Sequence, residues 1–196
     1  MKRIIRENKG SMRPGQDLVA AGFAGDAGAR VIAQERTEEL LGWFSRDYVM
    51  QLCEEEPMVV NPELEHWTTC GITECEAVGE GGIYTALWNL SGGYETGIEF
   101  QIRKIPVKQS TIEVCERYDL NPYRLLSDGC VVFVADNGGQ FCELLGQQGI
   151  PAAVIGKVNP GIRREICLEG NRGFLDRPKK DELKKVVPGY FKNRNK

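Results

Sequence analysis

The sequence predicts an α/β (α+β) protein in which helices cover a layered, mixed β-sheet. Short apolar runs with strand-like patterns, such as Gly97–Ile102 and Cys130–Ala135, recur along the chain. Other segments place apolar residues at helical spacing. Glycine-rich turns separate the two kinds of segment, and this alternation is typical of layered α/β domains.

The ends of the 196-residue chain differ in charge from its centre. Residues 1–16 carry five basic groups and one acid, and residues 177–196 carry eight basic groups and two acids, although the net charge is −3. We therefore expect a flexible basic arm (1–16), one domain (17–175) and a basic charged tail (176–196). Few aromatic residues lie among the basic groups, which disfavours nucleic-acid binding.

Composition also restricts the cellular location. No apolar run approaches the roughly 18–20 residues that cross a bilayer, so we expect no membrane contact. The basic start is not followed by the apolar segment of a secretory signal. The chain has seven cysteines, and their spacing is not that of a disulfide framework, which is typical of proteins in a reducing compartment. We expect a cytoplasmic protein.

The first third of the chain predicts a strand and two helices. Asp17–Ala21 is a strand candidate. Gly22, Gly25 and Gly28 favour a tight helix entry over a nucleotide loop, because their spacing is not that of a dinucleotide motif. Apolar residues from Ala29 to Phe44 form a helical stripe, and a second helix is expected over 45–55. Residues 57–73 show no clear pattern.

The remaining elements alternate more clearly. A helix is expected at Ile83–Leu90, and the capping box Ser110–Glu113 predicts another that runs to about Tyr118. The continuous apolar run Cys130–Ala135 predicts a strand covered on both faces. We expect one further helix and two further strands, in the segments 138–148, 152–158 and 166–168.

Reactive and metal-binding residues give little support for catalysis. His66, Cys70 and Cys75 lack the paired-cysteine spacing and the four ligands of a zinc site. The other cysteines lie in apolar contexts, which indicates small core residues. No third group supports a cysteine–histidine pair. We therefore assign no metal site and no catalytic residue.

Two turns of small residues are the candidate ligand site. The first precedes the Ile83 helix, where free backbone N–H groups and the helix dipole favour an anion. The second precedes the Cys130 strand, and its amides can hold an anion in the same way. The candidate residues are Gly79, Glu80, Gly81, Gly82, Ser127, Asp128 and Gly129.

Two carboxylates near the first turn admit two interpretations. Glu76 and Glu80 could serve acid–base chemistry or hold a metal ion. We favour the alternative that they are solvated acids, stabilised near a helix N-terminus by its dipole.

Five motifs follow one another over about three quarters of the chain. They are Gly22–Ala33, Val78–Trp88, Lys104–Val107, Leu120–Gly129 and Gly149–Val158. Together they resemble the C-terminal domain of the AIR synthase (phosphoribosylaminoimidazole synthetase) superfamily, in particular its AIR-synthase-related and hydrogenase-maturation branch. The resemblance implies a layered α/β domain whose mixed sheet is covered by helices.

The sequence departs from that family in two ways. The resembled enzymes carry ATP and its metal chiefly on a preceding domain, but only sixteen residues precede Asp17, so we expect that domain to be missing. The family's glycine turn usually reads His-Asp-x-Thr/Ser-x-Gly-Gly. Here Glu76, Ala77 and Gly79 take the positions of the histidine, the aspartate and the hydroxyl residue. The resemblance therefore implies a scaffold without the family's reactive groups, and we expect no cofactor.

Three functions remain open. The first is a stand-alone, catalytically silent domain that binds a small phosphate-bearing ligand or a partner protein. The second is a structural or regulatory subunit without a ligand, and the third is the C-terminal half of a split ATP-dependent enzyme. We also predict a homodimer or a partner subunit that covers the apolar stripe between Ala29 and Phe44.

Overall fold

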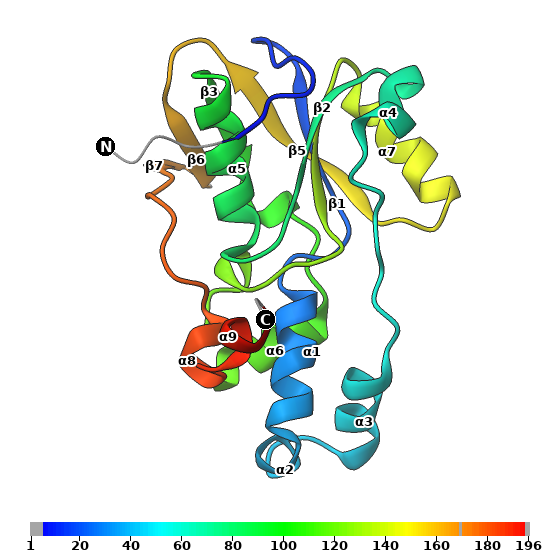
Figure 1. Cartoon of the computed structure of the whole chain (residues 1–196), viewed down its shortest axis with the longest axis vertical. Helices are drawn as coiled ribbons and strands as arrows, with labels where there is room; N and C mark the ends of the chain where they lie inside the picture. The colour runs from blue at the N-terminus through cyan, green and yellow to red at the C-terminus, as the bar shows by residue number, and fades with distance from the viewer. Residues whose placement is uncertain (1–5, 169, 195–196) are drawn as a thin grey trace.

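The computed structural model describes residues 6–168 and 170–194. Its central feature is a seven-stranded mixed β-sheet. Its strand order is β2-β4-β1-β5-β3-β6-β7 (Figure 1). The strands are β1 (Asp17–Ala21), β2 (Ile72–Ala77), β3 (Gly97–Gln101), β4 (Val131–Ala135), β5 (Ala152–Asn159), β6 (Arg164–Leu168) and β7 (Asn171–Phe174). Neighbouring strands are antiparallel except β3 and β6. The predicted mixed sheet and fold class are confirmed.

Helices cover both faces of the sheet, and further helices form a separate lobe (Figure 1). One face carries α5 (Gly82–Gly93), and the other carries α4 (Leu64–Trp67) and α7 (Gly138–Gln147). The lobe contains α1 (Asp26–Glu35), α2 (Thr37–Leu40), α3 (Arg46–Glu54), α6 (Gln109–Arg117), α8 (Leu183–Val186) and α9 (Tyr190–Arg194). Short 3₁₀ helices connect the larger elements: η1 (Thr68–Cys70), η2 (Ile102–Lys104) and η3 (Pro122–Arg124). No helix in the described part of the chain is both long and apolar enough to cross a membrane.

The core of the sheet forms on both of its faces. All five residues of β4 are buried, which confirms the prediction of a strand covered on two sides. On one face, Leu87 and Leu90 of α5 belong to the same apolar cluster as Phe100 of β3. On the other face, the ring of Phe141 lies 5.0 Å from that of Phe133 and 5.4 Å from that of Trp67. The sheet therefore separates two apolar layers.

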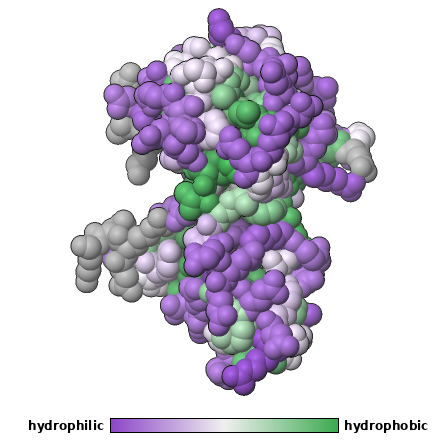
Figure 2. Space-filling view, turned by 90° about the vertical axis from the view of Figure 1, so that its right-hand side faces the viewer, coloured by the Kyte–Doolittle hydropathy of each residue, from purple (hydrophilic) through white to green (hydrophobic). Residues whose placement is uncertain are grey.

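The helical lobe has its own apolar core, which contains Ile32 of α1, Leu52 of α3 and Val114 of α6. The molecule narrows between this lobe and the sheet, and apolar residues gather at the waist (Figure 2). The glycine turns of the candidate site lie where the sheet joins the lobe, because they end β2 and precede β4.

The structure corrects three predicted elements. The helix expected over 29–44 ends at Glu35, because Arg36 leaves the helical conformation with φ −126°. The capping box at Ser110 is wrong, since α6 begins at Gln109 without a side-chain cap. The segment 57–73, which showed no clear pattern, contains α4, η1 and the first two residues of β2.

Residues 6–16 of the predicted arm pack against the domain, and residues 1–5 lie outside the described part of the chain. Residues 6–16 lie along the outer strand β2, where the Ser11 N–H donates to the Thr73 carbonyl at 2.8 Å and Met12 is buried. In the predicted tail, Leu183 and Phe191 belong to the core of the helical lobe, and residues 195–196 lie outside the described part of the chain. Both segments are therefore structural parts of the domain in the described region.

The apolar stripe expected to be exposed between Ala29 and Phe44 is covered. Ala29, Ile32 and Leu40 are buried against other helices of the lobe. Trp43 alone among the large apolar residues of this stretch is exposed, at 61%. Most of the stripe on which an interface was expected is therefore buried within the lobe.

Candidate functional site

The first turn of the candidate site needs glycine for two reasons. Gly81 and Gly82 adopt left-handed conformations, with φ 83° and 66°. A Cβ atom on Gly82 would lie 2.5 Å from the Tyr123 carbonyl oxygen and 2.8 Å from that of Leu125. The double glycine thus permits close packing of α5 onto the segment 122–127, whether or not a ligand binds.

The fold brings the two predicted turns together. The Ser127 N–H donates to the Gly79 carbonyl at 3.4 Å. Ser127 itself is fully buried, and its hydroxyl accepts from the Gly25 N–H and donates to the Leu125 carbonyl, both at 2.7 Å. The side chain of Ser127 is therefore used to join the turn to the α1 entry.

Glycine at position 129 also has a packing role. It adopts φ 92°, and a Cβ atom there would lie 2.2 Å from the Met58 carbonyl oxygen. The Val60 N–H donates to the Gly129 carbonyl at 2.9 Å. The extended segment 58–60 consequently lies directly on the second turn.

A carboxylate from the tail lies at the first turn, where the sequence predicts a bound anion. Asp181 is 2% exposed, and its Oδ2 accepts from the Gly81 N–H at 2.5 Å. Its Oδ1 accepts from the Leu126 N–H at 3.3 Å and from the Leu183 N–H at 2.8 Å. Burial raises the pKa of Asp181 above its ordinary value, while the three N–H donors act in the opposite direction. The amides expected to hold a ligand anion are thus partly satisfied by the chain itself.

The two acids near the turn form ion pairs with basic residues of the tail and the arm. The Glu80 carboxylate accepts from Lys184 Nζ, in the tail. The Glu76 carboxylate accepts from Arg6 Nε at 2.6 Å, in the arm. Glu76, whose side chain is 20% exposed, is therefore not the solvated acid that was expected, whereas the Glu80 side chain is 50% exposed, as expected for a solvated acid.

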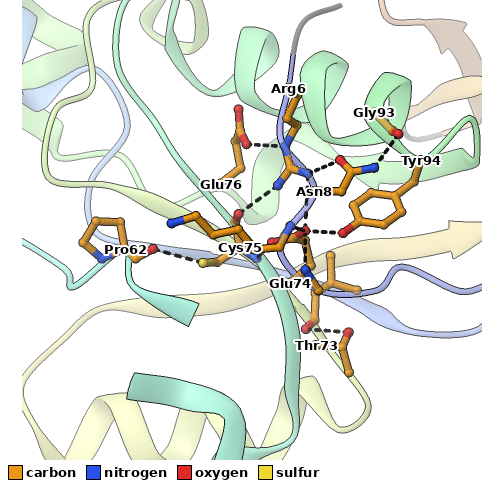
Figure 3. Close-up of polar contacts among 12 residues, drawn as sticks. Arg6, Asn8, Pro62, Thr73, Glu74, Cys75, Glu76, Gly93 and Tyr94 are labelled. Atoms are coloured by element: carbon orange, nitrogen blue, oxygen red, sulfur yellow. Dashed lines mark hydrogen bonds and ion pairs between the residues drawn. The ribbon is translucent and has the colours of Figure 1, made fainter. Parts of the chain in front are cut away.

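A third acid, Glu74, is the centre of a polar cluster that holds the arm (Figure 3). Its side chain is fully buried and accepts from Arg6 Nη1 at 3.3 Å and from the Tyr94 hydroxyl. It also accepts from the N–H groups of Lys9 and Gly10, at 3.2 and 3.1 Å. Burial acts to raise the pKa of Glu74, but these hydrogen bonds prevail and lower it.

The cluster is structural, because its donors and acceptors satisfy one another. Arg6 also donates to the Cys75 carbonyl at 3.0 Å, and the Asn8 side chain donates to the Gly93 carbonyl at 2.7 Å (Figure 3). Burial and the Glu74 carboxylate raise the pKa of Tyr94 to about 12. The arm is thereby fixed to both β2 and the end of α5.

The residues weighed as metal ligands serve other contacts. The Cys75 thiol donates to the Pro62 carbonyl at 3.1 Å, and burial raises its pKa to about 11. The His66 ring lies edge-on to Trp67. Among the residues that the structure describes, no group of three or more His, Cys, Asp or Glu side chains is placed to hold a metal ion.

Sequence reasoning missed Asp181 and Glu74, the two acids that organise this region. A signal existed for Asp181, since an aspartate two residues before Leu183 is a helix-start pattern. Glu74 lies between Ile72 and Cys75 in a segment without clear alternation. A β-bulge between Ile72 and Glu74 turns its side chain inward, and sequence periodicity does not reveal such a shift.

Comparison with protein families gives one match. The model described as "AIR synthase related protein, C-terminal domain" matches residues 13–166. No curated protein matches the chain. The matched range ends before β7 and the tail, so Asp181 lies outside it.

Several solved structures share the fold. HypE from E. coli, a hydrogenase maturation protein, has 20% identity and a TM-score of 0.65, over 90% of this chain and 54% of that chain. HypE from a HypE–HypF complex has 24% identity and a TM-score of 0.64, over 87% and 55%. Thiamine-monophosphate kinase from Stenotrophomonas maltophilia K279a has 18% identity and a TM-score of 0.60, over 79% and 51%. The chain spans about half the length of each, and at these identities the likeness shows the fold alone.

Proposed function

The chain belongs to the AIR synthase related family, whose C-terminal domain it matches, and from this membership we propose that it is a non-catalytic binding domain whose ligand is another protein. A fold by itself does not define a function, so the proposal depends on the groups at the two turns. It assigns no chemical step to the residues of this chain.

The observation that carries the proposal is the position of Asp181. A phosphate group at the first turn would need the Gly81 amide, which donates to this buried carboxylate at 2.5 Å. Two anions cannot share the amide without strong repulsion. Since Glu76 and Glu80 are also ion-paired, the turn offers neither an open anion site nor an unpaired carboxylate for proton transfer.

The waist offers apolar surface beside the same turns. Segment 58–60 packs on Gly129, and Val59 within it is 69% exposed. Figure 2 shows apolar residues gathered at this waist between two polar lobes. Contiguous apolar surface on a folded domain is typical of a protein interface. We therefore place the partner on the waist.

The comparisons support a separate polypeptide as the partner. This chain covers only about 54–55% of the matched chains of the same fold, and one of those structures was solved as a HypE–HypF complex. That complex concerns HypE. For this chain we propose a different partner protein, and one candidate is a separate polypeptide that carries an ATP-binding domain.

A second candidate function is the binding of a phosphate-bearing ligand at Gly79–Gly82 and Ser127–Gly129. It is favoured by the contact between the two turns, in which Ser127 N lies 3.4 Å from the Gly79 carbonyl oxygen. A phosphate group can bind there only after the tail moves the Asp181 carboxylate away from the Gly81 N–H.

The two candidates are separated by purifying the tagged chain from the organism that encodes it. We expect a stoichiometric partner that co-elutes with the wild type and is lost with Val59→Asp. Trp43→Asp is the matched control, because its side chain is exposed to a similar degree, 61% against 69%, in the other lobe. The melting temperature of the wild type should not change when inorganic phosphate or ATP is added. A partner-free wild type whose melting temperature rises with phosphate would favour the second candidate.

A further inference from the structure

The segment that crosses the waist is acidic at both of its ends. Residues 55–63 have no regular secondary structure and connect α3 of the helical lobe to α4 beside the sheet (Figure 1). Between positions 47 and 65 the chain carries six acids and neither lysine nor arginine. All six are exposed, and they are Asp47, Glu54, Glu55, Glu56, Glu63 and Glu65.

Five of these acids have no ion-pair partner within the described part of the chain. Glu55 is the exception, because its carboxylate lies 2.9 Å from Lys108 Nζ. The same ammonium group lies 3.1 Å from the Asp26 carboxylate, and the Lys108 side chain is only 16% exposed. Lys108 therefore neutralises the inner side of this region, and the outer acids keep an unbalanced negative charge.

A hollow of about 450 Å³ lies at the α3 end of the segment. Its lining consists of Asp47, Met50, Gln51, Glu54 and Glu55. Carboxylates beside a thioether suit a lysine or arginine side chain, whose charged head pairs with the acids while its apolar stem contacts the methionine. No three acidic, histidine or cysteine side chains in the described chain are placed to share a metal ion. The hollow thus matches a basic side chain better than a bare cation.

Val59 lies between the two groups of acids. Its side chain is 69% exposed, because the neighbouring Val60 is buried and donates its N–H to the Gly129 carbonyl at 2.9 Å. Glu55 and Glu63 are each four residues away, which is at most about 14 Å in an extended chain. Figure 2 shows polar residues on both sides of the apolar waist. The surface therefore has the order acid, apolar, acid.

We propose that the waist binds a partner surface on which one apolar side chain lies between two groups of lysine or arginine. This inference rests on the proposed function and adds the chemical class of the partner. The apolar group covers Val59, and a basic side chain on one side enters the hollow on α3. A basic side chain on the other side pairs with Glu63 or Glu65. An acidic partner is repelled by these charges, and a neutral one leaves them without a counter-charge.

The test uses a synthetic peptide as the probe, Lys-Lys-Ser-Leu-Leu-Ser-Lys-Lys, in which pairs of lysines lie on both sides of two leucines. Its counterpart has glutamate at every lysine position. NMR spectra of the isotope-labelled whole chain are recorded with up to about 1 mM peptide, which detects a dissociation constant of about that size. The lysine peptide should shift amide signals of residues 47–65, and the glutamate peptide should leave them unchanged.

Charge reversal separates the acids from the apolar contact. The double variant Glu54→Lys with Glu63→Lys should raise the dissociation constant of the lysine peptide at least about tenfold in about 0.1 M NaCl. In about 1 M NaCl, where the Debye length falls from about 10 to about 3 Å, the wild type and the double variant should converge. Glu116→Lys is the matched control, because Glu116 is an exposed acid of α6 without an ion pair in the described chain, and it should bind like the wild type. Circular dichroism confirms that each variant is folded.

A wild type whose signals do not respond to the lysine peptide, or that binds it no better than the double variant does, overturns the inference. In the co-elution experiment, a partner that is lost with Val59→Asp but retained by the double variant leaves the waist interface in place and overturns only its assigned charge. A wild type that binds the lysine peptide at residues 47–65 but co-elutes with no protein refutes the proposed function, while the preference of this surface for basic, apolar chains stands.

Discussion

At the scale of single residues, three acids determine how the ends of the chain attach to the domain. Glu74 and Glu76 bind Arg6 of the arm, and Asp181 binds the Gly81 amide from the tail. Each is a charged group in a partly or fully buried place, where loss of one partner leaves the other unsatisfied. We therefore expect each of these three residues to contribute more to the free energy of unfolding than a typical surface residue does.

Replacement of Glu74 by glutamine should lower the free energy of unfolding at pH 7 by about 2–3 kcal/mol, because Arg6 loses a buried partner. The pKa of Glu74 is lowered in the folded state. Its carboxylate therefore stabilises the fold above the unfolded pKa, about 4.3, and this contribution is lost as the pH falls through the lower folded value.

Urea denaturation at pH 7 and pH 3 measures this effect, with Glu143→Gln on the exposed side of α7 as the control. The difference in unfolding free energy between wild type and Glu74→Gln should shrink at pH 3. A difference that stays constant or grows toward acid contradicts the assigned role of the carboxylate.

At the scale of elements, local sequence patterns predicted those strands and helices whose conformation does not depend on contacts with distant residues. The alternation in β3 and the apolar run of β4 were sufficient, because each strand keeps one orientation throughout. The joint between α1 and α2 depends on the non-helical conformation of Arg36, whose guanidinium donates to the Val186 carbonyl at 2.8 Å. That contact joins residues 150 positions apart, and no local pattern records it.

The candidate site shows the same division between local and distant information. A glycine pair in the first turn and small residues in the second indicated the helix and the strand that follow them, α5 and β4. The carboxylate that fills the first turn comes from residue 181, about 100 positions later. The charged composition of the tail predicted solvation, whereas three widely spaced apolar residues, Leu183, Val186 and Phe191, anchor it.

Replacement of Asp181 by alanine should release the tail from the first turn. We expect a loss of about 2–4 kcal/mol, because backbone N–H donors at Gly81 and Leu126 lose their acceptor in a buried place. For a chain of this length this corresponds to a fall in melting temperature of roughly 5–15 °C.

Differential scanning fluorimetry measures the fall, and the control is Asp176→Ala in the same tail. Asp176 forms exposed ion pairs, so its loss should have little effect. Trypsin should cleave Asp181→Ala at Lys179 and Lys180 faster than the wild type. Equal melting and equal cleavage in the two variants would show that Asp181 does not hold the tail.

At the scale of the whole molecule, the domain presents two surfaces of different character. The waist is apolar, carries exposed acids on both sides of Val59 and lies next to the glycine turns. The end of the sheet at β6 and β7 combines a charged hollow with exposed Phe174. The two surfaces belong to different parts of the fold, so a partner on the waist leaves this end of the sheet accessible.

The isolated chain should neither hydrolyse ATP nor transfer its phosphate. Phosphoryl transfer needs positioned cations and donors around the γ-phosphate. Here the first turn is filled by Asp181, and Glu76 is paired with Arg6. Release of ADP in the presence of Mg²⁺ should stay at background. Turnover in the wild type that disappears in Glu76→Gln would contradict this prediction, whereas turnover equal in both would indicate a contaminating enzyme.

The central position of β1 has a consequence for how the chain is made. β1 leaves the ribosome early, but Ala21 pairs with Val131 on one side and Ala152 on the other, about 110 and 130 residues later. At about 5–20 residues per second, this strand waits roughly 5–20 s before its first neighbour is synthesised. The sheet therefore cannot form stepwise as the chain emerges. We therefore expect the pairing of β1 with its neighbours to be a late step, after most of the polypeptide has been synthesised.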